Sequence, residues 1–161
     1  MRRFIRSSTP GATYFFTVTS KDRRSSTLVD RVDILRGCFA RVRALHPFDI
    51  DAVVVLPEHL HAMWTLPIDD AAFPLRWMLI KRMFTRAIGS SPWQERYWEH
   101  QIRDDLDYER HVNYIHFNPV KHGHVARAAD WPYSSFHRYV RQAVLPADWG
   151  LSVEQPGQFG E

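Results

Sequence analysis

Hydrophobic residues recur along this chain with two periods, and each period predicts a kind of secondary structure. Runs rich in β-branched and aromatic residues, alternating with polar ones, predict strands over residues 13–19, 48–56, 59–66 and 97–102. Apolar residues spaced three and four apart predict amphipathic helices over residues 28–45, 75–88 and 104–117. A further short helix is expected from residue 134 to residue 142.

The order of these elements predicts an α+β fold of the ferredoxin-like, RRM-like type. A split βαβ pattern of this kind gives an antiparallel sheet with helices packed on one face, and here extra helices follow at the C-terminal end. The turn at Pro57-Glu58 joins the second and third strands as a hairpin. We expect a single domain over residues 1–145 and an irregular tail over residues 146–161.

The third strand contains the run His59-Leu60-His61, in which two imidazoles flank one aliphatic residue. Side chains alternate between the two faces of a strand, so both histidines project to one face and Leu60 to the other. Two nitrogen donors on a rigid strand form half of a metal site. Chance also supplies this spacing in a chain with nine histidines, and His122-Gly123-His124 is a second example in a turn-like segment.

The third long helix carries a polar stripe that fits either a functional site or an ordinary helix edge. Asp107, His111, Tyr114 and Asn118 follow one another at helical spacing, beside an apolar stripe that should pack on the sheet. Pro119 disfavours helical geometry at Asn118 and therefore predicts that the helix ends there. By itself Tyr114 also fits a tyrosine at the edge of the core. His111 is a weaker candidate for proton transfer, and we interpret His116 as structural.

Composition indicates a folded, mildly basic protein. The 161 residues carry a net charge of +3, and arginines gather in the first third of the chain. Guanidinium groups suit phosphate contacts, although a solvated basic surface explains them equally well. The single Cys38 excludes an internal disulfide and fits a cytoplasmic location. No apolar run is long enough to span a membrane, so we expect no membrane partner.

Five ordered blocks make the pattern more specific. They are residues 10–17, 56–62, 93–104, 114–123 and 131–135, and they include Leu-Pro-Glu-His-Leu-His-Ala and Tyr-Ile-His-Phe-Asn-Pro-Val. In this order they resemble the HUH single-tyrosine transposases, and within them the REP-associated tyrosine transposases. One departure is Gly11-Ala12, where that family often has two glycines. The departure touches the loop before the first strand and not the chemistry.

The resemblance implies metal-dependent cleavage and rejoining of single-stranded DNA at REP-like palindromic hairpins. Tyr114 would attack the scissile phosphate and form a 5′-phosphotyrosine. His59 and His61 would hold Mg²⁺ or Mn²⁺ with Asn118 as a third ligand, and zinc remains an alternative. The protein would act as a monomer or a homodimer.

The residues expected to contact the DNA belong to the basic N-terminal segment, the first strand and the second long helix. They are Arg2, Arg3, Arg6, Thr13, Tyr14, Lys81, Arg82 and Arg86. The sequence is also compatible with two other functions: a nucleic-acid-binding domain of the same fold without catalysis, and a zinc-dependent hydrolase.

Overall fold

The computed structural model describes residues 9–151 of the chain. Its elements are β1 (Thr13–Thr19), α1 (Thr27–Asp30), α2 (Val32–Leu45), β2 (Asp49–Val55), β3 (His59–Thr65), α3 (Phe73–Ile88), β4 (Trp98–Gln101), α4 (Asp105–Lys121), the 3-10 helix η1 (Ala128–Asp130) and α5 (Phe136–Arg141). The four strands form one antiparallel sheet in the order β2-β3-β1-β4. The predicted α+β fold with a split βαβ arrangement is confirmed.

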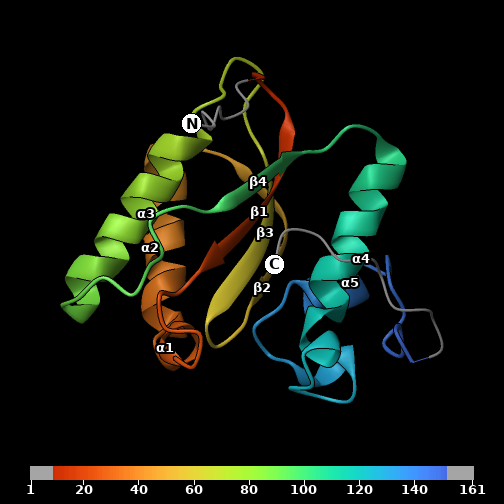
Figure 1. Cartoon of the computed structure of the whole chain (residues 1–161). Helices are drawn as coiled ribbons and strands as arrows, with labels where there is room; N and C mark the ends of the chain where they lie inside the picture. The colour runs from red at the N-terminus through yellow and green to blue at the C-terminus, as the bar shows by residue number, and fades with distance from the viewer. Residues whose placement is uncertain (1–8, 152–161) are drawn as a thin grey trace, which may run out of the picture.

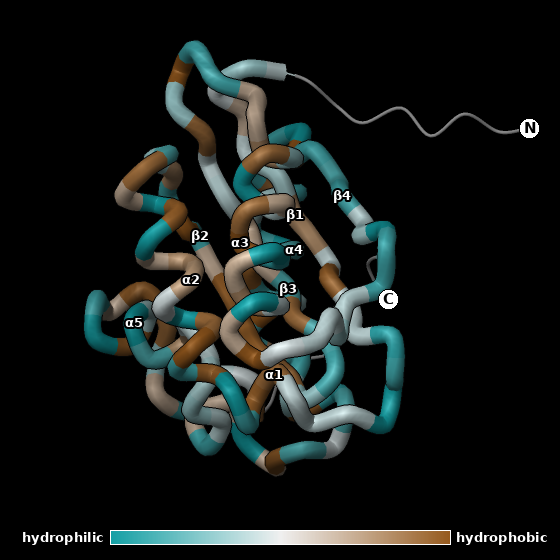
Figure 2. Tube along the Cα trace, turned by 90° about the vertical axis from the view of Figure 1, so that its left-hand side faces the viewer, coloured by the Kyte–Doolittle hydropathy of each residue, from teal (hydrophilic) through white to brown (hydrophobic). Residues whose placement is uncertain are grey.

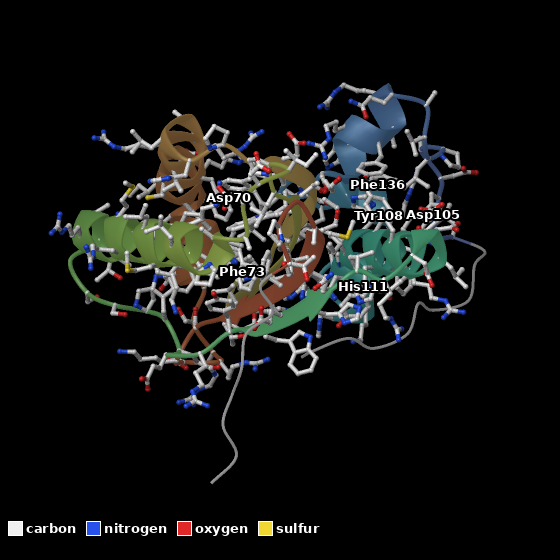
Figure 3. All side chains as sticks on the ribbon, turned by 90° about the horizontal axis from the view of Figure 1, so that it is seen from above. Asp70, Phe73, Asp105, Tyr108, His111 and Phe136 are labelled. Atoms are coloured by element: carbon white, nitrogen blue, oxygen red, sulfur yellow. The ribbon has the colours of Figure 1, made fainter. Side chains whose placement is uncertain are left out.

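Helices cover both faces of the sheet, rather than one face alone (Figures 1 and 3). On one face α2 and α3 pack against Leu60, Ala62 and Trp64, as the alternation along β3 predicts. On the other face α4 packs on β2 and β3, where it buries Phe15 and Met63. The strands carry large apolar side chains on both faces, so a second helical layer is needed to keep water from them.

The helix that carries the polar stripe is longer than Pro119 predicts. α4 begins after the N-cap Asp104 and continues through Pro119 to Lys121. A proline inside a helix removes one backbone hydrogen bond. Only two residues of α4 follow Pro119, so the proline affects only the last turn of the helix. The His122 amide donates to the Asn118 carbonyl at 3.0 Å and closes the last turn. Lys121 therefore belongs to the same helix as Tyr114.

The C-terminal end of the described chain is irregular but packed. Residues 147–150 form turns, and the Trp149 ring lies 5.9 Å from the ring of Phe136. The expected division into a domain of residues 1–145 and a tail of residues 146–161 stays a prediction, because residues 152–161 lie outside the described part. Among the described helices, none is both long enough and apolar enough to cross a membrane.

Candidate active site

The two histidines of β3 lie side by side on the face of the sheet that α4 covers. Their ring centroids are 4.8 Å apart. Both side chains are almost completely buried, at 2% exposure for His59 and 0% for His61. The register of β1 against β3 places Thr17 opposite His61 and Thr19 opposite His59. The prediction that both imidazoles share one face is confirmed.

Each imidazole is held through its Nδ1 atom. His61 Nδ1 lies 2.9 Å from the Thr17 hydroxyl oxygen, and His59 Nδ1 lies 2.7 Å from Glu58 Oε1. In both rings Nε2 is therefore the nitrogen left to act as a ligand, and His59 Nε2 is buried without a hydrogen bond among the described residues. Metal-binding histidines are usually oriented in this way, by a carboxylate or another oxygen on the second ring nitrogen.

Glu58 is the charged partner of His59. Burial by itself would raise the pKa of the Glu58 carboxyl. The hydrogen bond to His59, the charge on that ring and the nearby Arg23 outweigh burial and hold the pKa below its ordinary value. The carboxylate form therefore persists next to the imidazole and fixes the orientation of the ring.

α4 brings Tyr114 to the histidine pair. The Tyr114 ring centroid is 5.2 Å from that of His61, and its side chain is 1% exposed. Lys121, two turns further along α4, donates a hydrogen bond to the Tyr114 hydroxyl at 3.2 Å. Its ammonium also lies 4.9 Å from the centroid of the Tyr114 ring. Asn118 follows one turn after Tyr114 and is completely buried.

The donor set fits a divalent metal. Two imidazole nitrogens come from His59 and His61, and an amide oxygen from Asn118 on the facing helix is of the right chemical type to complete the set. An imidazole nitrogen that is buried without a partner, as His59 Nε2 is, costs free energy unless something binds it.

Four residues that surround the site were not among those predicted from the sequence. They are Thr17, Glu58, Lys121 and His122. The last of these lies in the segment read as a simple turn, yet its ring centroid is 5.2 Å from that of His59. The glycine that follows, Gly123, has a φ of +75°, and its amide donates to the Val120 carbonyl at 3.0 Å, so the turn closes the end of α4 directly after His122.

The two remaining histidines of α4 have other partners. His116 Nε2 lies 2.8 Å from the Ser135 hydroxyl oxygen, and burial lowers the pKa of this imidazole to about 3. His116 is therefore neutral and structural, in agreement with the sequence.

His111 belongs to another cluster, in the N-terminal half of α4 (Figure 3). Ligand atoms of His100, Asp107 and His111 lie within 4.8 Å of one another. His100 Nε2 donates to Asp107 Oδ2 at 2.8 Å, and His111 Nδ1 donates to the Asp107 carbonyl, also at 2.8 Å. These hydrogen bonds join β4 to the first turns of α4. They thereby help to set the position of the helix that carries Tyr114.

The structure does not gather the residues expected to contact DNA around this site. Arg2, Arg3 and Arg6 lie outside the described residues. Tyr14 has no exposed surface and packs on Phe73 in the core, so it offers no contact to DNA.

The other members of that set are held or placed elsewhere. The Thr13 hydroxyl bonds the Thr65 hydroxyl at 2.8 Å. Lys81 donates to the Gln94 carbonyl at 3.0 Å. Arg82 and Arg86 are exposed on α3, which covers the opposite face of the sheet from the histidines.

A tyrosine on a helix, beside a His-x-His pair on the sheet of a split βαβ fold, defines the class of HUH single-tyrosine enzymes. No protein-family model matches the chain. It is 48% identical over 154 residues to the REP-associated tyrosine transposase of Escherichia coli (strain K12), covering 95% of this chain and 93% of that protein. It is also 39% identical over 165 residues to a putative REP-associated tyrosine transposase of Haemophilus influenzae (strain ATCC 51907 / DSM 11121 / KW20 / Rd), covering 93% and 94% of the two chains.

A solved structure agrees with these relatives. A REP-associated tyrosine transposase bound to a REP hairpin superposes with a TM-score of 0.91 at 45% identity, covering 99% of this chain and 98% of that one. This chain belongs to the family of REP-associated tyrosine transposases. It is thus a transposase, an enzyme that processes DNA, and the family implies a divalent metal.

Proposed function

We propose that this chain cleaves and rejoins single-stranded DNA at hairpins of REP-like palindromic sequence, through a 5′-phosphotyrosine on Tyr114. The observation that carries the proposal is the 5.2 Å separation of the Tyr114 and His61 rings, with His59 directly beside them. A nucleophile and a pair of metal ligands therefore face the same volume, which is the requirement for attack on a phosphate held there.

The reaction needs one bond to form and one to break. The Tyr114 hydroxyl releases its proton to solvent as its oxygen attacks phosphorus, and the bond from phosphorus to the 3′ oxygen of the preceding nucleotide breaks. The departing oxygen takes a proton and becomes a 3′-hydroxyl, while the 5′-phosphate stays on the tyrosine. Because the ester link conserves the energy of the phosphodiester, a 3′-hydroxyl can reverse the step and join a strand without a nucleotide cofactor.

Lys121 compensates for the low nucleophilicity of a protonated tyrosine. A phenol has an ordinary pKa near 10, so it holds its proton at neutral pH. The Lys121 ammonium donates to the Tyr114 oxygen at 3.2 Å and places a positive charge where phenolate charge develops. Such a contact favours the reactive form of the tyrosine before the phosphate arrives.

We assign His59, His61 and Asn118 to the metal, which we propose to be Mg²⁺ or Mn²⁺. When bound, the ion polarises a phosphate oxygen and stabilises charge in the transition state. The Glu58 and Thr17 oxygens orient the two imidazoles, as the distances of 2.7 and 2.9 Å to Nδ1 require. The cytoplasm, where chromosomal DNA is available, is the compartment we propose for this activity.

An adduct assay tests the proposal. A DNA hairpin with a single-stranded flank is incubated with the full chain and Mn²⁺, and the products are separated on a denaturing protein gel. We expect a protein–DNA adduct that disappears in the Tyr114→Phe variant and in wild type treated with a chelator. Tyr108→Phe, which alters the same helix but keeps the Tyr114 hydroxyl, is the control and should retain the adduct.

The same assay separates the two alternative functions. A nucleic-acid-binding domain without catalysis would shift the hairpin on a native gel but form no adduct. A zinc-dependent hydrolase would cut without an adduct, and zinc rather than Mg²⁺ or Mn²⁺ would restore the chelated protein. Either result would contradict the proposed function.

A further inference from the structure

The edge strand β4 lies beside the N-terminal half of α4 and differs in composition from the strand next to it. Its sequence is Trp-Glu-His-Gln, and Figure 2 shows it as hydrophilic, with hydrophobic segments on the neighbouring β1. The register of β4 against β1 pairs His100 with Phe15, so both side chains lie on the face of the sheet that α4 covers. The edge strand therefore directs an imidazole toward the helix.

Three potential metal ligands meet at this corner: His100 from β4, and Asp107 and His111 from α4. One ligand atom from each lies within 4.8 Å of the other two. The two imidazole rings are nearly parallel, at an angle of 17°, and their centroids are 4.8 Å apart. The Asp107 carboxylate contacts both rings, at 2.8 Å from His100 Nε2 and 3.2 Å from His111 Nδ1. Two imidazoles and one carboxylate form a common ligand set for first-row transition metals.

The protonation of these groups is compatible with metal binding. Burial lowers the pKa of His111 below its ordinary value, by more than the Asp107 carbonyl and carboxylate raise it, so this imidazole is neutral at pH 7. The Asp107 carbonyl accepts a hydrogen bond from His111 Nδ1 at 2.8 Å, which leaves the lone pair of the ring on Nε2. His100 shares one proton with the Asp107 carboxylate, and a metal ion would displace that proton to solvent.

Solvent reaches the cluster from the side of β4. Asp107 and His111 are buried, whereas the His100 side chain is 28% exposed. The Arg103 Nε also approaches the Asp107 carboxylate, at 3.6 Å, but the arginine side chain is 76% exposed. An exposed ion pair of this kind contributes little, so the guanidinium can move aside for a dication. The open side leaves room for a water molecule as a further ligand, as in zinc sites with three protein ligands.

The cluster is distinct from the histidine pair of β3, although α4 covers both. The Phe15 ring stands between the two sets, with its centroid 4.8 Å from that of His111 and 5.5 Å from that of His61. Phe15 has no exposed surface, so its ring fills the space between the imidazoles. Each set would therefore hold an ion of its own.

We propose that His100, Asp107 and His111 bind a zinc-type transition-metal ion that joins β4 to α4. The ion would fix the helix about one turn before Tyr114, because His111 precedes the tyrosine by three residues. The proposal makes no assumption about the DNA substrate. It therefore stands or fails separately from the proposed function.

Zinc binding to the full chain tests the ligands. Protein freed of metal is dialysed against a series of Zn²⁺ concentrations, and bound zinc is counted per chain. His100→Gln should weaken binding at one site by at least about 100-fold, because even the loss of a group that only orients a ligand costs about 10- to 100-fold. His46→Gln, which removes a half-buried imidazole at the end of α2, is the control and should bind zinc as wild type does. Equal affinity and stoichiometry in His100→Gln and His46→Gln would overturn the proposal.

A second measurement separates this site from the histidine pair of β3, which can also bind zinc. Co²⁺, which occupies zinc sites and absorbs visible light there, is added to the His59→Gln/His61→Gln variant. We expect the absorption of one bound Co²⁺ to remain in this variant and to disappear when His100→Gln is added to it. Loss of the absorption in His59→Gln/His61→Gln alone, in protein that still unfolds cooperatively, would overturn the proposal.

A metal link between β4 and α4 should also stabilise the folded state. In the His59→Gln/His61→Gln variant, Zn²⁺ at about 100 times its dissociation constant should raise the midpoint of thermal unfolding by about 5–10 °C, because the ion binds only the folded chain. The additional substitution His100→Gln should abolish this shift. An equal shift with and without His100→Gln would overturn the proposal, and adduct formation at Tyr114 would then still stand.

Discussion

Lys121 donates a hydrogen bond to the Tyr114 hydroxyl at 3.2 Å, across two turns of α4. The contact exists because α4 passes through Pro119 instead of ending at Asn118. A helix that ended earlier would leave the lysine in a loop. The helix therefore fixes both the nucleophile and the cation beside it.

Removal of this cation should slow chemistry more than binding. We predict that Lys121→Met lowers the rate of adduct formation about 10- to 100-fold, because the developing charge on the tyrosine oxygen loses its donor. Single-turnover kinetics at saturating protein measure this rate, and anisotropy measures hairpin affinity. Lys121→Arg keeps the charge and should retain part of the rate. An unchanged rate in Lys121→Met would exclude the proposed role.

Glu58 should tune the metal requirement of the reaction. Glu58→Gln removes the carboxylate that holds His59 Nδ1 at 2.7 Å. We predict that the Mn²⁺ concentration for half-maximal adduct formation rises about 10- to 100-fold, with the rate at saturating metal largely restored. Glu95→Gln changes an exposed glutamate and should behave as wild type. If Glu58→Gln and wild type titrate alike, Glu58 does not orient a metal ligand.

Asp107 should stabilise the start of α4. Its carboxylate accepts hydrogen bonds from the Arg103 amide at 2.9 Å and from His100 at 2.8 Å. We predict that Asp107→Asn lowers the free energy of unfolding by about 1–3 kcal/mol at pH 7, as measured by urea denaturation. Asp105→Asn changes an exposed carboxylate in the same turn and serves as the control. A similar loss in both variants would assign the effect to the helix dipole alone.

The pH dependence of this loss has a defined sign. Burial acts to raise the pKa of Asp107, but the hydrogen bonds from His100 and Arg103 and the charges of His100 and His111 hold it below its ordinary value. A lowered pKa means that the folded state binds the proton less readily than the unfolded state. The contribution of Asp107 is therefore complete above the ordinary aspartate pKa of 3.8 and is lost as the pH falls through the lowered value. The difference between wild type and Asp107→Asn should shrink in this acid range.

Periodicity in the sequence predicts the parts of the site that depend on single elements. Alternation along β3 places His59 and His61 on one face, and helical spacing places Tyr114 and Asn118 on one stripe. The strand bounds of β1, residues 13–19, are also as predicted. These features follow from backbone geometry, which a short segment specifies by itself.

Contacts between elements are harder to predict. Glu58 was assigned to a turn, Thr17 to a strand and His122 to a second turn, and each meets the site only after the chain folds. The prediction that helices lie on one face fails for a related reason, since only assembly of the sheet shows that Phe15 and Met63 need a cover of their own. A hollow beside β2 is likewise lined by residues of α2, β2, α5 and the segment 132–135, which are far apart in the sequence.

The polarity of the covalent link tests the central claim most directly. Two copies of one hairpin are labelled, one at the 5′ end and the other at the 3′ end, and each is incubated with the full chain and Mn²⁺. Peptide mass spectrometry of the adduct then locates the attached residue. We predict that the adduct carries only the 3′ label, that the 5′-labelled fragment ends in a free 3′-hydroxyl, and that the DNA is attached to Tyr114. An adduct that carries the 5′ label, or attachment to another residue, would contradict the account.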